Sequence, residues 1–313
     1  RFGAILQGHF AGVISWDAVN FSFAPYLTGM SDKEVRQFAQ MLIYEFSQLT
    51  SARGGQAMFT DIHLYWDVPK HLRNVPIIGP GGEVAGSNYE DFIADARRFA
   101  WAIFDVFMKG DGTGKPFIFP RPLVHITGAF FQTPGHEDFL KHICDVAVEK
   151  GNTCFLFDRE EVIKAYSCCL PAAAETGHLS LEAKMPWRMR CPALQNVTLN
   201  LPRLGYKALG DESRLLSMLS AIMEVAVKAH VQKKDFIEKL LSYGDEGPLA
   251  MLAMNRDGYP YLRMDHACFL IGIVGLNELV QIHTGSQLHE SEEALMFGLK
   301  LIGHMKDEAE KLS

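Results

Sequence analysis

The feature of this sequence that most constrains its fold is an alternation of short apolar runs with long amphipathic segments. Strand-like runs end near residue 65 and lie within residues 116–127, 153–157, 196–202 and 261–277. Apolar residues at helical spacing cover residues 1–15, 31–49, 88–107, 136–150, 212–241 and 290–312. Strands that alternate with long helices predict parallel β/α units, arranged as an open sheet or as a barrel. No repeat or linker interrupts this pattern, so we expect a single domain over residues 1–313.

Local signals place several element boundaries. Residues 31–34 read S-x-x-E, a capping box that begins a helix, and Asn88 can cap the helix after it. Residues 110–115 (GDGTGK) lack the first glycine and the final Ser or Thr of a phosphate-binding loop. We therefore predict a turn there, followed by a strand over residues 116–127. The glycine-rich residues 79–86 predict a surface loop.

Composition excludes several classes of protein. Hydrophobic residues make up 48% and charged residues 21%, which is the balance of a soluble globular core. No apolar run reaches the roughly 18 residues of a membrane span, and no secretory signal opens the chain. A net charge of −7 argues against nucleic-acid binding but allows a phosphorylated small molecule at a helix N-terminus. Six cysteines beside thirteen methionines indicate a reducing, cytoplasmic location.

Two adjacent thiols, Cys168 and Cys169, follow the strand-like run at residues 153–157, and we expect them on a loop. Neighbouring side chains of an extended chain point to opposite faces, so the pair is poorly placed to hold one tetrahedral metal ion. A disulfide between adjacent residues is strained. Two readings stay open: a thiol pair that carries redox or radical chemistry, and two ordinary buried cysteines.

Six further stretches, in the same order along the chain, resemble motifs of the anaerobic (class III) ribonucleoside triphosphate reductases, which are glycyl radical enzymes. They are residues 6–12 (LQGHFAG), 23–26 (FAPY), 53–62 (RGGQAMFTDI), 116–120 (PFIFP), 198–206 (TLNLPRLGY) and 271–278 (IGIVGLNE). The resemblance implies an α/β fold in which a ten-stranded barrel surrounds a central finger loop. This chain would form the central part of that barrel, incomplete at both ends.

The resemblance also implies residue roles. Cys169 matches the cysteine whose thiyl radical abstracts hydrogen from the ribose 3′ carbon, and Cys168 lies beside it. Gln56, Asn196 and Asn200 are candidate substrate contacts. The competing interpretation is structural: a strand entry around Gln56, and amides satisfied by the backbone at Asn196 and Asn200. The activity implied is anaerobic reduction of ribonucleotides, with triphosphates expected, to deoxyribonucleotides.

The implied cofactors and partners lie partly outside this sequence. The family carries a glycyl radical, which a radical-SAM activating enzyme generates, and a structural zinc site. Neither the motif of the glycyl radical loop nor the four-cysteine motif of the zinc site occurs in these residues. We therefore expect no cofactor in this chain, and no turnover by the chain alone. Deoxynucleotide or ATP effectors and a homodimer through the helices at 1–15 and 31–49 are further expectations. The sequence departs from the family at Leu170, where arginine is usual, and at Asp61, where asparagine is usual.

Two alternatives remain beside the reductase. A glycyl radical lyase of the pyruvate formate-lyase kind also uses adjacent cysteines, and a truncated paralogue could bind nucleotide without catalysis. The chain begins at Arg1 with core-like sequence, which favours a piece of a longer protein. No metal site is predicted: Cys144, Cys154 and Cys191 lack paired spacing, and His266 and Cys268 are expected in the core. These last residues are therefore not part of the predicted site.

Overall fold

The computed structural model describes residues 2–50, 56–158, 193–255, 258 and 260–312. Cys168, Cys169, Leu170 and Cys191 lie outside these residues, and what concerns them stays a prediction. The chain forms two compact units, residues 1–8 with 12–189 and residues 9–11 with 190–313. The expectation of one domain over the whole chain stays a prediction.

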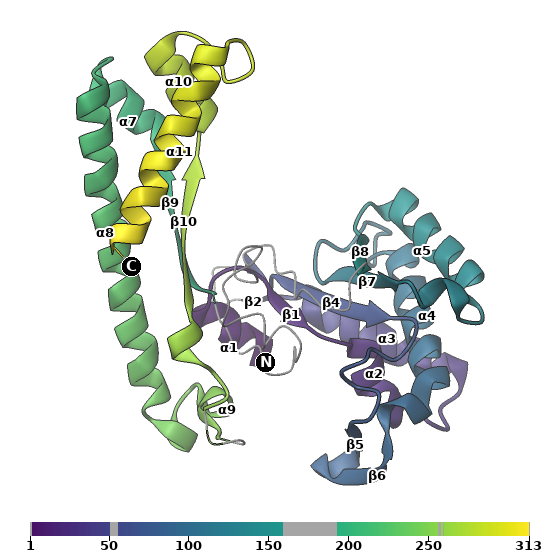
Figure 1. The fold of residues 1–313 in the computed structure, drawn as a ribbon. Helices are drawn as coiled ribbons and strands as arrows, with labels where there is room; N and C mark the ends of the chain where they lie inside the picture. Colours follow the sequence, from purple (N-terminus) through teal and green to yellow (C-terminus); the bar gives the residue numbers. More distant parts are fainter. Residues whose placement is uncertain (1, 51–55, 159–192, 256–257, 259, 313) are drawn as a thin grey trace. The chain divides into compact units, whose positions relative to one another are not determined.

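The first unit contains a four-stranded parallel sheet in the order β1-β4-β7-β8 (Figure 1). Its strands are β1 (Ile14–Trp16), β4 (Thr60–Tyr65), β7 (Arg121–Thr127) and β8 (Cys154–Asp158). Around them lie α1 (Phe2–His9), α2 (Val19–Phe23), α3 (Asp32–Ser47), α4 (Ile93–Lys109) and α5 (His136–Lys150). The parallel β/α arrangement predicted from the alternating pattern is confirmed in this unit.

Helices α3, α4 and α5 pack on one face of the sheet and form the core of the unit. Every second strand residue points into this core, from Ile62 and Leu64 on β4 to Val124 and Ile126 on β7. Aromatic residues of α4 and α5 fill the space between sheet and helices, including Phe99, Phe104, Phe107 and Phe139, all fully buried. Because side chains of a strand alternate between faces, the polar residues between these positions lie on the other face.

Local sequence signals explain where these helices begin and end. Ser31 and Glu34 form the expected capping box of α3, with the Ser31 amide donating to Glu34 Oε2 at 2.8 Å. Asn88 caps the short 3-10 turn before α4, and Gly151 ends α5 in the left-handed conformation. The helix predicted over residues 136–150 has these bounds in the structure.

Three predictions for the first unit are wrong in detail. The helix expected over residues 1–15 ends at His9, and Ile14–Trp16 form β1. Residues 116–120 are not a strand, because β7 begins at Arg121: Pro116 and Pro120 have no amide hydrogen to donate to a neighbouring strand. The glycine-rich loop at 79–86 belongs to a hairpin of β5 (Pro76–Ile78) and β6 (Val84–Asn88).

The turn predicted at 110–115 is present, and Asp111 Oδ1 accepts hydrogen bonds from the amides of Thr113 and Lys115. A second short hairpin joins β2 (Leu49–Thr50) and β3 (Gln56–Ala57).

The second unit pairs two parallel strands, β9 (Ala193–Asn200) and β10 (Cys268–Val274), with helices on one face. The helices are α7 (Leu201–Ala208), α8 (Glu212–Leu241), α9 (Ala250–Ala253), α10 (Leu276–Thr284) and α11 (Glu292–Leu312). Val197, Leu199 and Ile271 belong to a core shared with α7, α8, α10 and α11. The strand expected within residues 261–277 begins only at Cys268.

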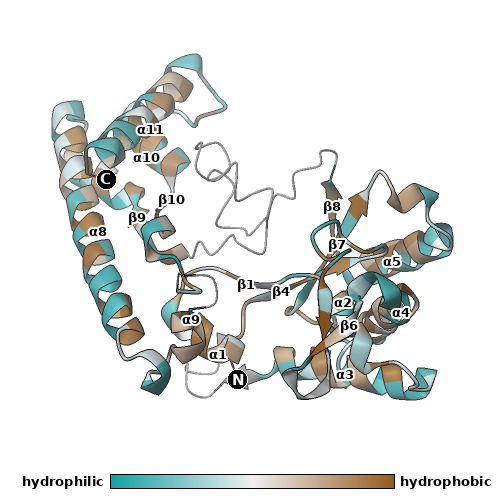
Figure 2. Ribbon diagram, turned by 60° about the horizontal axis from the view of Figure 1, so that its bottom comes forward, coloured by the Kyte–Doolittle hydropathy of each residue, from teal (hydrophilic) through white to brown (hydrophobic). Residues whose placement is uncertain are grey.

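Helix α8 alternates apolar and polar stripes along its length (Figure 2). Leu215, Leu219, Met223 and Ala226 recur at helical spacing and are buried, whereas Glu224 and Lys228 pair on the exposed side. By length and composition alone, α8 is the one helix among the described residues that could cross a membrane. Its buried stripe packs against α11 and the strands, so we interpret it as an amphipathic core helix.

Candidate functional site

The face of β9 and β10 opposite their helices carries two predicted site residues. Asn196, Thr198 and Asn200 alternate with the core residues of β9 and are exposed. Gly272 of β10 lies in register with Thr198, and a Cβ there would lie 2.9 Å from both Asn196 Oδ1 and Thr198 Oγ1. The glycine therefore leaves space that these two side chains occupy.

Asn200 has a structural role as well. Its Oδ1 accepts a hydrogen bond from the Arg203 amide at 3.2 Å and caps α7, in which Pro202 lies in the first turn. This contact supports the structural interpretation of Asn200 without removing its amide nitrogen from use. Gln56 lies in β3 of the other unit, and its predicted role as a substrate contact stays a prediction.

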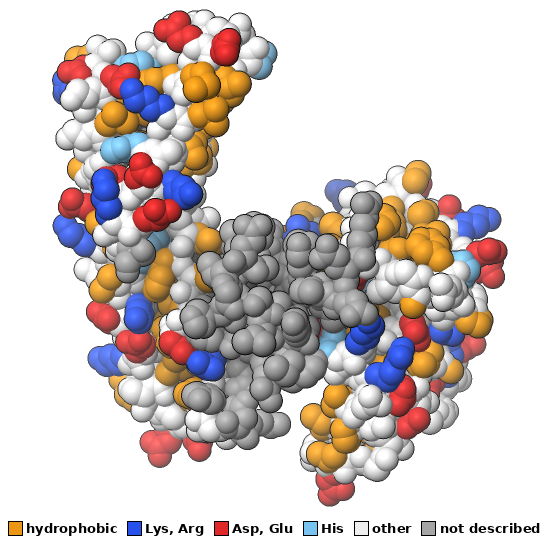
Figure 3. Space-filling model, in the orientation of Figure 1, with side chains coloured by type: hydrophobic (Ala, Val, Ile, Leu, Met, Phe, Trp, Pro, Cys, Tyr) orange, Lys and Arg blue, Asp and Glu red, His pale blue; other side chains and the backbone are white. Residues whose placement is uncertain are grey.

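On the face shown in Figure 3, acidic and basic side chains are interspersed over the described surface of the second unit. No broad basic area is visible on that face of the described chain, which agrees with the net charge of −7. This face of the described chain therefore lacks the basic patch that is typical of a nucleic-acid-binding surface.

The polar face of the four-stranded sheet gathers a cluster that sequence reasoning did not identify. It consists of Asp17, His63, Tyr65, His71, His125 and Asp158, which we call the histidine–aspartate cluster. Asp17 follows β1, and His71 lies in the loop after β4. The other four lie on strands: His63 and Tyr65 on β4, His125 on β7 and Asp158 at the end of β8. They approach the carboxyl ends of parallel strands, the edge at which α/β sheets commonly bind ligands.

A chain of short hydrogen bonds joins three of these residues. His125 Nδ1 lies 2.7 Å from Asp158 Oδ2, and His125 Nε2 lies 2.8 Å from His63 Nδ1. With the Asp158 carboxylate as acceptor and both rings neutral, His125 donates from Nδ1 and accepts at Nε2 from His63. His63 Nε2 is then a lone pair, buried and without a hydrogen-bond partner among the described residues.

Burial and hydrogen bonding together control the charge state of this cluster. Desolvation, reinforced by the neighbouring His125, lowers the pKa of His63 to about 4, so this ring is neutral at neutral pH. Desolvation also raises the pKa of Tyr65 well above its ordinary value. Desolvation is the largest single influence on the pKa of Asp17 and would raise it. The hydrogen bond and charge of His71, together with His63 and Tyr65, outweigh it, and the pKa of Asp17 lies below its ordinary value.

Asp17 is the half-exposed end of the cluster. Tyr65 donates its hydroxyl hydrogen to Asp17 Oδ1 at 3.0 Å, and His71 Nε2 lies 2.8 Å from Asp17 Oδ2. The Tyr65 ring also stacks on His125, with ring centroids 4.0 Å apart. Buried Asn20 fixes the end of β4, because its amide bonds both the N–H and the C=O of Tyr65.

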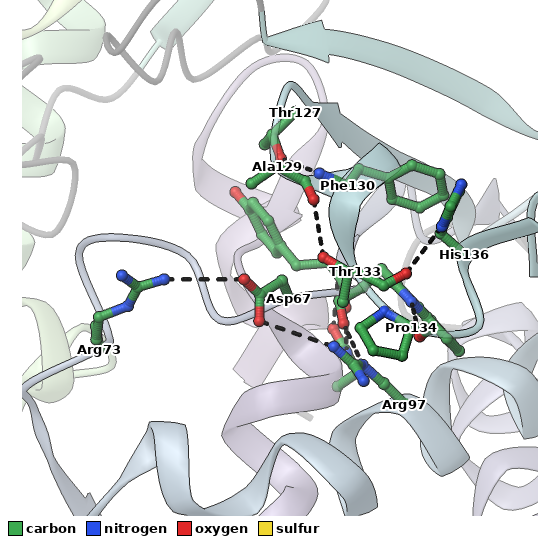
Figure 4. Close-up of polar contacts among 12 residues, drawn as sticks. Asp67, Arg73, Arg97, Thr127, Ala129, Phe130, Thr133, Pro134 and His136 are labelled. Atoms are coloured by element: carbon green, nitrogen blue, oxygen red, sulfur yellow. Dashed lines mark hydrogen bonds and ion pairs between the residues drawn. The ribbon is translucent and has the colours of Figure 1, made fainter.

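The loops after β4 and β7 support this edge of the sheet (Figure 4). Asp67 lies between two guanidinium groups, 3.8 Å from Arg73 and 3.9 Å from Arg97. Arg97 Nε also donates to the Trp66 carbonyl at 2.9 Å. After β7, Thr127 Oγ1 accepts from the Phe130 amide at 3.1 Å. These contacts hold in place the backbone that follows His125 and Tyr65.

At the opposite end of the same strands, Asp61 and Arg121 form a bidentate ion pair. Arg121 Nε and Nη2 lie 2.8 and 2.9 Å from the two carboxylate oxygens of Asp61. Asp61 is fully buried and is in register with Arg121 across β4 and β7. Asp61 stands where the resembled family usually has asparagine, and its additional negative charge is thus paired with the positive charge of Arg121.

The signal for the histidine–aspartate cluster was present in the sequence as alternation. Residues 60–65 read T-D-I-H-L-Y, so polar residues occupy every second position of a strand that is buried on both faces. An alternating buried strand predicts polar groups that need hydrogen-bond partners. The partner of His63 is His125, which lies on another strand 62 residues further along the chain. Sequence alone does not supply that pairing.

The fold resembles solved anaerobic ribonucleotide reductases of Thermotoga maritima. The structure with citrate in the active site has a TM-score of 0.63 at 17% identity, covering 99% of this chain and 55% of that chain. The structure with dATP bound in the specificity site has a TM-score of 0.63 at 17% identity, covering 99% and 51%. The complex with dATP and CTP has a TM-score of 0.62 at 16% identity, covering 99% and 50%.

These similarities show that the chain has the fold of part of the anaerobic ribonucleotide reductases, and it spans about half the length of these solved chains. No curated protein sequence matches it. The family model described as NRDD, anaerobic ribonucleoside-triphosphate reductase, matches residues 1–313. The chain belongs to the anaerobic ribonucleoside-triphosphate reductase family, and the resemblance found in its motifs is confirmed.

Proposed function

We propose that this chain carries the central part of a catalytic barrel that reduces ribonucleotides, expected as triphosphates, to deoxyribonucleotides under anaerobic conditions. The observation that carries the proposal is the family match over residues 1–313. It favours the reductase over a pyruvate formate-lyase-like enzyme, because the match is to the reductases. A nucleotide-binding paralogue without catalysis is the remaining alternative, and the experiment below separates it.

The architecture is compatible with this activity. Both parallel sheets have helices on one face and polar side chains on the other, which is the pattern of barrel walls. In the proposal, these strands belong to a ten-stranded barrel whose central finger loop carries Cys169. Such an interior excludes water and side reactions from radical intermediates.

Cys169 is the proposed radical residue. Its thiyl sulfur takes a hydrogen atom from the ribose 3′ carbon and becomes a thiol, leaving the radical on the sugar. Neighbouring side chains of a loop diverge, so Cys168 is the adjacent packing residue. The glycyl radical that oxidises Cys169, its activating enzyme and the structural zinc site remain part of the proposal, as does a cytoplasmic location.

Nucleotide contacts are proposed at Asn196 and Asn200 on the polar face of β9, and at Gln56. The amide side chains of Asn196 and Asn200 support this role, since they are exposed and present hydrogen-bond donors and acceptors on the polar face of β9. The Thermotoga maritima structures hold dATP in a specificity site, and dATP together with CTP. We infer that this protein likewise binds a ribonucleotide and a deoxynucleotide effector, and that α1 and α3 contribute to a homodimer.

The test is an anaerobic assay of the intact gene product with its radical-SAM activating enzyme. Cys169→Ser should abolish deoxyribonucleotide formation, because a serine hydroxyl does not yield the required oxygen radical. Cys168→Ser is the matched control and should retain substantial activity. Equal activity of the two variants would overturn the assignment of Cys169. No deoxyribonucleotide from the wild-type protein, with nucleotide binding retained, would favour the non-catalytic paralogue.

A further inference from the structure

We propose that Asp17, His63 and His125 of the histidine–aspartate cluster bind a divalent transition-metal ion. A carboxylate oxygen of Asp17 and one ring nitrogen of each histidine all lie within 4.8 Å of one another. This inference rests on the first unit alone and does not depend on the proposed reductase activity.

The donor set defines the kind of ion. Two imidazoles and one carboxylate suit Zn²⁺, Fe²⁺ or Co²⁺ better than the hard cations Ca²⁺ and Mg²⁺, which prefer oxygen ligands. Three protein ligands leave at least one coordination position open, as in catalytic rather than structural metal sites. Asp17 is about half exposed, whereas His63 and His125 are buried, so the open position faces the accessible side of the cluster.

Neighbouring residues form hydrogen bonds with the proposed ligands His125 and Asp17, as residues behind the ligands of a metal site commonly do. Asp158 accepts a hydrogen bond from His125 Nδ1 at 2.7 Å, which leaves His125 Nε2 as the ligand nitrogen. Such a carboxylate–histidine pair fixes the tautomer of the ring and raises its basicity toward a metal. Tyr65 and His71 orient the two oxygens of Asp17 in the same way.

The facing ring nitrogens of His63 and His125 are nearly as far apart as two nitrogens bound to the same metal ion. His63 Nδ1 and His125 Nε2 are 2.8 Å apart, against about 3.3 Å for two nitrogens on one tetrahedral zinc ion with bonds of about 2.0–2.1 Å. The ion would replace the proton that now joins the rings. Binding would therefore require the two rings to move slightly apart, and no hydrogen bond at His63 Nε2 among the described residues opposes that movement.

The experiment is a titration of the full chain, freed of metal by a chelator, with Co²⁺ followed by visible absorption and with Zn²⁺ in competition. We expect one Co²⁺ per chain in a nitrogen and oxygen environment. His125→Gln and Asp17→Asn should each weaken binding by at least about 100-fold. Asp158→Asn should weaken it about 10–100-fold, the effect of losing an outer partner.

Three controls keep the result interpretable. Asp17 is half exposed, so Asp17→Asn tests the site in a chain whose core is intact, as circular dichroism would verify. His142→Gln, a histidine paired with Asp105 outside the cluster, should leave the affinity unchanged. Thiolate-to-cobalt charge-transfer bands would place the ion on one of the six cysteines instead.

Absence of Co²⁺ and Zn²⁺ binding by the wild-type chain would overturn the proposal. So would an affinity that His125→Gln and Asp17→Asn leave unchanged, or thiolate bands in the cobalt spectrum. In each of these outcomes the cluster is a hydrogen-bonded network that orients β4, β7 and β8 without a metal.

Discussion

Gly272 of β10 lies directly beside Thr198 of β9, and the space where its Cβ would be is filled by the hydroxyl of Thr198 and the amide of Asn196. The two strands are thus fitted so that polar side chains of one cover the backbone of the other. A glycine at this position makes the polar face of the pair continuous.

Gly272→Ala should rearrange this face at little cost in stability. The new methyl group would meet the ends of two exposed side chains, which can rotate away, so we expect an unfolding free energy within about 1 kcal/mol of wild type, below the usual cost of core overpacking. If Asn196 contacts nucleotide, ribonucleotide affinity should fall in isothermal titration. Gly303→Ala in α11, where nothing lies within 4 Å, is the control and should leave affinity unchanged. An unaltered affinity of Gly272→Ala would argue against the role of Asn196.

Two substitutions of Asn200 should distinguish its role as the cap of α7 from its proposed role in binding nucleotide. Asn200→Ala removes the cap of α7 and should lower the unfolding free energy by about 1 kcal/mol in urea denaturation. Asn200→Asp keeps an oxygen for the Arg203 amide but loses the amide donor, so its stability should stay near wild type. A loss of nucleotide affinity in Asn200→Asp at unchanged stability would identify a ligand contact. Equal stability of the alanine and aspartate variants would contradict the capping role.

The Asp61–Arg121 pair should respond asymmetrically to substitution. Arg121→Met leaves a fully buried carboxylate without its cation and should cost about 3–5 kcal/mol. Asp61→Asn leaves Arg121, whose side chain is 34% exposed and can reach water, so the loss should be smaller. Combining both changes should cost less than the sum of the single changes. Additive losses in urea denaturation would show that the two groups do not stabilise each other.

His230 should make stability depend on pH. Desolvation by burial lowers the pKa of His230 below its ordinary value of 6.5 in the folded chain, where Nδ1 lies 3.3 Å from Gln195 Oε1. Its contribution to stability is therefore present above pH 6.5 and lost as the pH falls through the folded-state pKa. His230→Gln should flatten the fall in urea midpoint below pH 6.5 relative to wild type. His304→Gln is the control, at a histidine of α11 whose Nε2 lies 2.8 Å from Ser220 Oγ. An identical pH profile in His230→Gln would contradict this assignment.

Sequence reasoning predicted best what local interactions determine. The capping box at Ser31 and the apolar spacing along α5 and α8 fix these helices, because each signal involves residues within a few positions of one another. The family motifs likewise identified the family from short stretches of adjacent residues. The strand expected at residues 116–120 failed for a reason that is also local, since two prolines there cannot donate to a sheet.

Most of the long helices, the parallel β/α class and the adjacent thiols as candidates for chemistry could be predicted from the amino-acid sequence. Which polar side chains meet depends instead on the pairing of the strands. Residues 17, 63, 125 and 158 converge because β1, β4, β7 and β8 pair in that order and register. Strand order and register follow from burying one face of the whole sheet against α3, α4 and α5, a non-local balance of packing that no short stretch of sequence encodes.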